Sequence, residues 1–134
     1  MMRDLGDRTE LPVTAVTFPT SLADLEAMAL PTIVLDLGGK IVALNSAAMR
    51  FGHSGPRSRP RHEIIGMLAS KFAPGIEYLW DERIAAGRSP DGAMFEIAVT
   101  LRKGALLLEH VVKVYELDGQ PAVVIVITGA RPLT

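Results

Sequence analysis

His110 is the residue of this chain with the clearest capacity for chemistry. It lies in an alternating stretch, 105–117, where Glu109 and Lys113 mark one face and His110 falls on the opposite, apolar face. A neutral imidazole inside an apolar cavity can bind haem iron or hydrogen-bond a small ligand. The alternative is a core histidine whose ring is satisfied by a backbone carbonyl or by water.

Trp80 is the second candidate, because an indole ring can stack on a bound ring system. A tryptophan is also commonly the largest core residue of its helix, so packing alone explains it as well. Together, His110 and Trp80 are the expected cavity contacts of any ligand.

A basic cluster lies in and around a segment rich in Gly, Pro and Ser. Its members are Arg50, His53, Arg57, Arg59, Arg61 and His62. It could take a phosphate or nucleic acid, but the net charge is −1 and no aromatic residues are interleaved, which favours a solvated loop. Its histidines lack i,i+4 spacing and a third ligand, so no metal site is expected.

The composition excludes several classes of protein. There is no cysteine, so disulfides, thiolate metal sites and a cysteine nucleophile are all absent. No apolar run reaches the roughly 18 residues that a membrane helix needs, and no signal sequence is recognisable at the start. Catalytic patterns such as a Ser–His–Asp order or paired carboxylates are also missing. We therefore expect a non-enzymatic cytoplasmic protein without membrane or nucleic-acid partners.

The elements that position these residues follow from periodicity and turn signals. Residues 20–30 predict a short helix that Ser21 caps, with Asp24 completing a capping box. Strands are expected at 32–37, 40–44, 93–101, 105–117 and 122–128, with turns at Gly38-Gly39, Lys103-Gly104 and Asp118-Gly119. Between the second and third strands, helices are expected at 46–51, within 63–72 and, most clearly, at 76–87. Two strands, a helical middle and three strands indicate an α+β fold with a five-stranded antiparallel sheet.

The last strand is apolar on both faces, which indicates that something covers the outer face of the sheet. The N-terminal helix and a second subunit are both candidates. Accordingly, the residues expected at a dimer interface are Leu22, Leu25 and Met28 on that helix, with Val123 and Ile125 on the last strand. For the helix residues, packing on their own sheet is an equal alternative.

Several segments, taken in order, resemble the PAS family. The pattern Asp36-x-x-Gly39-x-Ile41-x-x-x-Asn45-x-Ala47-Ala48-x-x-Phe51-Gly52 is similar to the opening signature of that family, and Ile64-Ile65-Gly66 resembles its next landmark. Trp80 to Gly87 resembles the long central helix, and three strands complete the order over roughly residues 30–128. The resemblance implies a curved five-stranded sheet with helices over one face, a small central cavity and an N-terminal helix at a dimer interface.

Departures from the family pattern reduce the number of cofactors that the resemblance allows. Ala69 stands where flavin-linked photosensory relatives have a reactive cysteine, so that photochemistry is excluded. Haem-binding relatives usually carry the iron ligand on the long helix, and residues 76–87 contain no histidine, which disfavours haem. The cofactor therefore stays unknown. The Asp of the terminal Asp-Ile-Thr signal is missing at Val126, so the chain is expected to be either a fragment of a regulator or a stand-alone protein.

These observations predict an N-terminal tail at 1–19, a cap helix at 20–30 and a PAS domain at 31–134. The expected function is a sensory and dimerisation module of a bacterial-type signalling protein. It would form a homodimer, take a small-molecule ligand and regulate a kinase, cyclase or transcription factor. The alternatives are a receptor for haem or a small molecule using His110, and, below it, a small α+β enzyme.

Overall fold

Five strands form one antiparallel sheet in the order β3-β2-β6-β5-β4. The structure is a computed structural model that describes residues 16–52, 60–101 and 104–133. Its elements are η2 (Leu22–Ala27), β2 (Thr32–Leu35), β3 (Ile41–Leu44), α1 (Ser46–Gly52), α2 (Arg61–Ile64), α3 (Ala69–Phe72), α4 (Trp80–Gly87), β4 (Ala93–Leu101), β5 (Gly104–Leu117) and β6 (Gln120–Pro132). The predicted α+β fold class is confirmed.

The turn between β2 and β3 forms for the local reasons that the sequence indicates. Gly39 has φ 91°, a conformation that residues with a Cβ rarely adopt. The Asp36 carboxylate accepts a hydrogen bond from the Lys40 backbone N–H at 2.9 Å. Asp36 thus stabilises the turn.

The two faces of the sheet carry separate cores. On the inner face, under α1 to α4, the buried residues include Leu35, Ile41, Leu108 and Val112. The outer-face core contains Val34, Val111, Val124 and Val126. Alternation along each strand separates the two sets, because successive side chains point to opposite faces.

The central helix begins later than the sequence predicts. α4 starts at Trp80, whereas residues 76–79 form turns and Leu79 adopts the left-handed conformation with φ 56°. A residue in that conformation cannot continue an α-helix on its N-terminal side. The expectation of one helix from 76 to 87 was therefore wrong over its first four residues.

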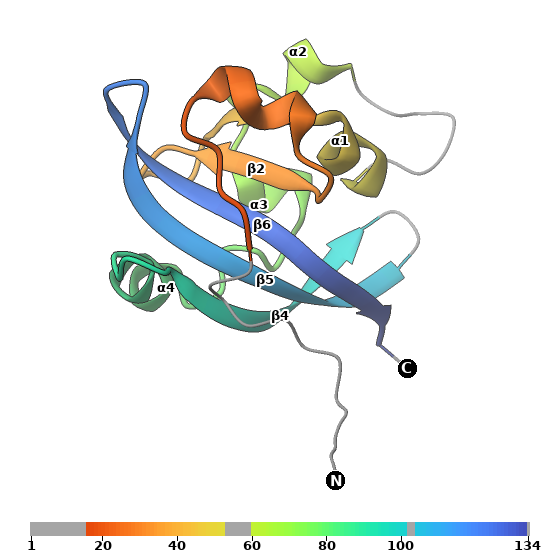
Figure 1. Cartoon of the computed structure of the whole chain (residues 1–134). Coiled ribbons are helices and arrows are strands. Elements are labelled where there is room, and N and C mark those ends of the chain that lie inside the picture. The colour runs from red at the N-terminus through yellow and green to blue at the C-terminus, as the bar shows by residue number, and fades with distance from the viewer. Residues whose placement is uncertain (1–15, 53–59, 102–103, 134) are drawn as a thin grey trace, which may run out of the picture.

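The N-terminal strap, which we define as residues 16–30, covers the outer face of the sheet. Its residues Val16 and Leu25 are buried in the outer core, and Phe18, Leu22 and Met28 pack against that core. Figure 1 shows this red and orange segment crossing the near face of the sheet. Of the two candidate covers, the chain's own N-terminal segment therefore occupies the outer face, and residues 16–19 are part of it.

The helix in the strap differs from the prediction in type and capping. Residues 22–27 form a 3-10 helix, and the Ser21 side chain makes no capping hydrogen bond. The Asp24 carboxylate instead accepts from the backbone N–H of Thr20 at 3.2 Å and from its hydroxyl at 2.6 Å. Asp24 therefore closes the turn that precedes the helix, and the predicted capping box with Ser21 is wrong.

Two of the predicted interface residues lie on the opposite face. Val123 and Ile125 are fully buried in the inner core, each with 0% of its surface exposed. They pair with Val114 and Val112 of β5, and directly opposed residues in an antiparallel pair share a face. Neither side chain has surface left for a second subunit, so placing them at a dimer interface was wrong.

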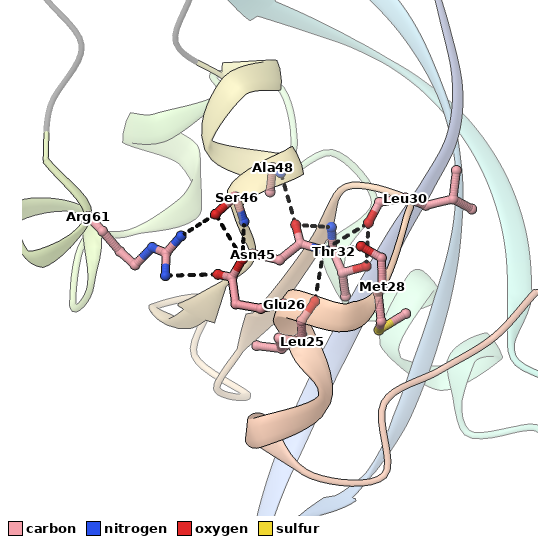
Figure 2. A network of polar contacts seen from close by, with 9 residues as sticks. All are labelled: Leu25, Glu26, Met28, Leu30, Thr32, Asn45, Ser46, Ala48 and Arg61. Atoms are coloured by element: carbon pink, nitrogen blue, oxygen red, sulfur yellow. Dashed lines mark hydrogen bonds and ion pairs between the residues drawn. The ribbon is translucent and has the colours of Figure 1, made fainter.

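Asn45 joins the strap to the sheet and to α1. Its Oδ1 accepts from the backbone N–H groups of Thr32 at 3.1 Å and Ala48 at 2.9 Å, and the second bond caps α1. Its Nδ2 donates to the carbonyls of Leu25 at 3.2 Å, Met28 at 3.4 Å and Leu30 at 2.9 Å. Figure 2 shows how one amide thus satisfies polar groups from three segments.

Glu26 ties the strap to α1 and α2 on the surface. Its carboxylate accepts from the Ser46 backbone N–H at 3.3 Å and from the Ser46 hydroxyl at 2.8 Å, and forms an ion pair with Arg61 at 2.9 Å (Figure 2). The hydrogen bond from the Ser46 hydroxyl is the main cause that lowers the pKa of Glu26 below its ordinary value of 4.5.

Glu26→Gln should lower the melting temperature slightly at neutral pH and have no effect in strong acid. Because folding lowers the pKa of Glu26, its contribution is present above pH 4.5 and is lost as the pH falls through the folded-state value. The gap between wild-type and variant melting temperatures should close as the pH is lowered from 6 toward 3. The matched control is Glu82→Gln on α4, an exposed site; an equal pH-dependent gap for both variants would contradict the role of Glu26.

Candidate functional site

Arg83 of α4 is a cation inside the inner core, with 1% of its surface exposed. One terminal nitrogen, Nη1, donates to the carbonyl oxygens of Ile76 and, at 3.1 Å, Tyr78. These carbonyls belong to the turn before α4, so the guanidinium stabilises the left-handed entry at Leu79. The other terminal nitrogen, Nη2, lies 2.6 Å from Nε2 of His110.

His110 lies on the inner face, as predicted, and is buried with 1% of its surface exposed. A guanidinium can only donate, so Nε2 of His110 must accept from Arg83. The proton of the neutral ring is then on Nδ1, which donates to the Leu108 carbonyl at 3.3 Å. A β-bulge between Glu109 and His110 lies at this point of the β5–β6 pairing.

Two aromatic rings enclose the charged pair. The Cζ atom of Arg83 lies 5.9 Å from the ring centroids of both Trp80 and Phe95. Phe95, which pairs with His110 across β4 and β5, also stacks on the imidazole at 6.3 Å. Cation–π attraction to two rings partly offsets the loss of water around the guanidinium.

The burial fixes the protonation states of the pair. Burial, and after it the neighbouring charge of Arg83, lower the pKa of His110 to about 3, while the hydrogen bond to the Leu108 carbonyl opposes them. Burial lowers the pKa of Arg83 to about 10, which leaves the guanidinium charged at neutral pH. The site therefore carries one positive charge, on Arg83, beside a neutral imidazole.

Trp80 stands at the edge of this site and lines a pocket of about 150 Å³. The pocket lies between the β2–β3 turn and α3, and its lining includes Gly39, Leu68, Ala69 and Ile76. The indole N–H donates to the Leu37 carbonyl at 3.3 Å. Trp80 is thus both a packing residue of the inner core and a wall of a pocket.

The contacts of His110 differ from those that haem ligation or acid–base catalysis at this residue would need. Both nitrogens of His110 have partners, so its ring offers no lone pair to haem iron as the side chains lie. An acid–base pair would need a carboxylate beside His110, and the charged group there is Arg83. Among the described residues, no group of three or more His, Asp or Glu could hold a metal ion.

Of the basic cluster, the structure describes Arg50, Arg61 and His62. His53, Arg57 and Arg59 lie outside the described residues. Arg61 is exposed and pairs with Glu26, so it serves to hold the strap in place.

Arg83 and Phe95 are the site residues that sequence reasoning missed. Arg83 shares the inward face of the helical segment with Ile76 and Trp80, a position where a charge is unexpected. An arginine on an otherwise apolar, inward face was the feature of the sequence that could have revealed the site, because it indicates a buried charge with a specific role. Phe95 packs against the inner core, and its contact with His110 depends on the register between β4 and β5.

As the pH falls from 6.5 to 5, the wild-type protein should lose stability because of His110, with a slope that rises to about 1.4 kcal/mol per pH unit. The unfolded chain binds a proton near pH 6.5, whereas the folded chain, with a pKa of about 3, does not. Stability is therefore complete above pH 6.5 and falls as the pH drops. His110→Gln should remove most of this slope in urea titrations at several pH values, whereas His62→Gln, an exposed control, should keep it. Equal slopes in wild type and His110→Gln would show that His110 is protonated in the fold.

No helix among the described residues is long and apolar enough to cross a membrane.

Three solved structures show a similar fold at low sequence identity. The PAS domain of an HTR-like protein from Haloarcula marismortui is 20% identical, with 84% of this chain and 88% of that one covered and a TM-score of 0.59. The PAS domain of nitrogen regulation protein NR(II) from Vibrio parahaemolyticus is 19% identical, with 84% and 96% covered and a TM-score of 0.55. The photoactive yellow protein domain of the sensor histidine kinase Ppr from Rhodospirillum centenum is 16% identical, with 81% and 93% covered and a TM-score of 0.59.

No protein-family model and no curated protein matches the sequence, so the assignment depends on structure. The sheet order, the helices over the inner face and the agreement over more than four-fifths of the chain all point the same way. The PAS resemblance read from the sequence is therefore confirmed at the level of the fold: this chain has the fold of a PAS domain.

Proposed function

We propose that the chain is a sensory and dimerisation module, without catalytic activity, that regulates a signalling protein through protein–protein contacts. The observation that carries the proposal is the polar centre of Arg83 and His110 in the inner core of a PAS fold. A buried charge costs free energy unless it is compensated, so such a centre indicates a role beyond packing. The structural neighbours include domains from sensor histidine kinases, which supports a signalling role.

In this proposal the chain acts in the cytoplasm and passes its signal to a kinase, cyclase or transcription-factor domain. His110, Arg83 and Trp80 form the sensing centre. A small ligand binding beside Trp80 would change the packing of α4 on the sheet, because Arg83 links α4 to β5 through His110. The strap, held on the other face of the same sheet, would pass the change to a partner.

The proposed homodimer would form through the strap rather than through β6. Leu22 and Met28 are only partly buried, so the strap keeps apolar surface after it covers the sheet. A pocket of about 590 Å³ lies along it, lined in part by Val16, Phe18 and Leu30. Leu25, with 4% of its surface exposed, is a core residue that supports the strap and does not itself meet a partner.

Native mass spectrometry of the purified chain, compared with its denatured mass, tests the proposal. A dimer is expected, and a retained small molecule would appear as extra mass on it. Leu22→Glu, which places a charge on the strap surface, should convert the dimer into a folded monomer, whereas Glu116→Gln, an exposed control on β5, should remain dimeric. A wild-type monomer with no bound molecule at micromolar concentration would contradict the proposed sensory dimer.

A further inference from the structure

Four large apolar residues are exposed around the pocket that Trp80 lines. With their exposed fractions, they are Leu37 (41%), Leu68 (40%), Tyr78 (62%) and Leu79 (41%), which we call the apolar patch. Leu68 lines the pocket, and Leu37 precedes Gly38, which also lines it. Tyr78 and Leu79 lie in the chain directly before Trp80. Single exposed apolar residues are common, but a cluster of them around a pocket indicates a surface that binds a partner.

The turn before α4 holds two of these side chains in solvent at a conformational cost. Leu79 has φ 56°, which is unfavourable for a residue with a bulky side chain. Such conformations persist only where the surroundings hold them, and they are concentrated at functional sites. Arg83 holds this one, because its Nη1 donates to the carbonyl oxygens of Ile76 and Tyr78. A glycine would fit the turn better, so packing within the chain does not explain an exposed leucine here.

The pocket at the centre of the patch has room for one side chain. Its volume of about 150 Å³ equals about five water molecules of the liquid. Its lining is mostly apolar or glycine, and consists of Gly38, Gly39, Leu68, Ala69, Ser70, Ile76, Glu77 and Trp80. Where proteins bind one another, a large side chain that fills such a pocket commonly supplies much of the binding energy.

The surface beside the patch is negatively charged on the side of α4. Glu77, Asp81 and Glu82 are exposed, and none of them forms an ion pair with another described residue. The nearby exposed lysines, Lys40 and Lys71, belong to the β2–β3 turn and to α3 instead. Opposite charges at the rim of an interface guide a partner and fix its orientation. The charges therefore match a partner with basic residues next to its apolar side chain.

We propose that the apolar patch binds a segment of another protein in which one large apolar side chain is flanked by lysine or arginine. The apolar side chain enters the pocket beside Trp80, and the basic groups lie against Glu77, Asp81 and Glu82. The inference goes beyond the proposed function, because it adds a protein contact away from the strap. The small ligand of the proposed function would use the same pocket, so ligand and partner would exclude each other.

Trp80 is the single tryptophan of the chain, so its fluorescence reports on the pocket. The test is a fluorescence titration of the full chain with a synthetic peptide that has one leucine between two pairs of lysines. Matched peptides replace the leucine with alanine, or every lysine with glutamate. We expect saturable binding of the lysine–leucine peptide. Alanine should weaken it about tenfold, because burial of the leucine is lost, and glutamate should weaken it several-fold at low salt.

Variants of the patch locate the binding site. Tyr78→Ser and Leu79→Gly should each weaken binding of the lysine–leucine peptide about tenfold. Both should fold, because Tyr78 is mostly exposed and glycine suits the left-handed conformation at position 79. The matched control is Leu133→Ser, which removes a leucine of similar exposure, 47%, just after β6 and should bind as wild type.

Absence of binding would overturn the inference, and so would equal affinity for the leucine and alanine peptides or for the lysine and glutamate peptides. Wild-type affinity in both Tyr78→Ser and Leu79→Gly would do the same. A dimer that Tyr78→Ser converts into a monomer would show that the patch binds a second copy of the chain instead. The proposed sensory dimer is tested separately, because Leu22→Glu changes only the strap and should leave the peptide affinity unchanged.

Discussion

Arg83→Ala should lower the free energy of unfolding of the ligand-free protein by about 3 kcal/mol. The substitution leaves the carbonyls of Ile76 and Tyr78 and Nε2 of His110 without their donor, and it opens a cavity between Trp80 and Phe95. The relief of a buried charge offsets part of this cost. For a chain of this length the melting temperature should fall by about 10 °C, which differential scanning calorimetry would measure.

Two further variants separate the causes. Arg83→Met fills most of the volume but offers no hydrogen bond, so it should recover about half of the loss if cavity formation and lost bonds contribute equally. Arg88→Ala removes an exposed arginine at the end of α4 and should change stability by less than about 0.5 kcal/mol. If Arg83→Ala were no more destabilising than Arg88→Ala, the guanidinium would not be what anchors α4 to the sheet.

The strands and the turns could be predicted because their signals are local. Gly38-Gly39 and Asp118-Gly119 each stand between apolar runs, and both form tight turns at the predicted places. The faces of β5 were also predicted correctly, because the charges of Glu109 and Lys113 mark the outer side. The inner core contains Leu108 and Val112, as that pattern indicates.

Over residues 122–128, neither face of β6 carries charged residues that would identify the outer side. For this reason the prediction that Val123 and Ile125 lie at a dimer interface was wrong. Register nevertheless supplies the missing information. The two-residue turn at Asp118-Gly119 pairs Leu117 with Gln120, and counting back pairs Val114 with Val123. Since Val114 was assigned to the inner face, Val123 had to share it.

The contact between Arg83 and His110 could not be predicted from the sequence, for a different reason. Arg83 and His110 are 27 positions apart, on a helix and a strand, and nothing in either segment indicates that they meet. The helix that carries Arg83 was also predicted to start too early, because Ile76 and Leu79 have helical spacing although Leu79 adopts a left-handed conformation. Only the tertiary fold decides which of these local signals prevails.

Asn45→Ala should cost about 3 kcal/mol of stability and loosen the N-terminal strap. The variant removes the cap of α1 and leaves the Thr32 N–H and three strap carbonyls without the amide that satisfies them. Amide hydrogen exchange should quicken in residues 22–30 more than in β5. The matched control is Gln120→Ala, which removes an exposed amide at the start of β6 and should leave both measurements unchanged.

Asn45→Asp tests which half of the amide holds the strap. The carboxylate keeps an oxygen that accepts from Thr32 and Ala48 but loses the donor to the carbonyls of Leu25, Met28 and Leu30. At neutral pH it also places a buried negative charge against three carbonyl oxygens, so the loss should be at least as large as in Asn45→Ala. Acidification should recover part of the difference, because a protonated carboxyl can donate one hydrogen bond. Wild-type exchange rates in the strap of Asn45→Asp would show that the capping oxygen alone is sufficient, and that the three carbonyls do not hold the strap on the sheet.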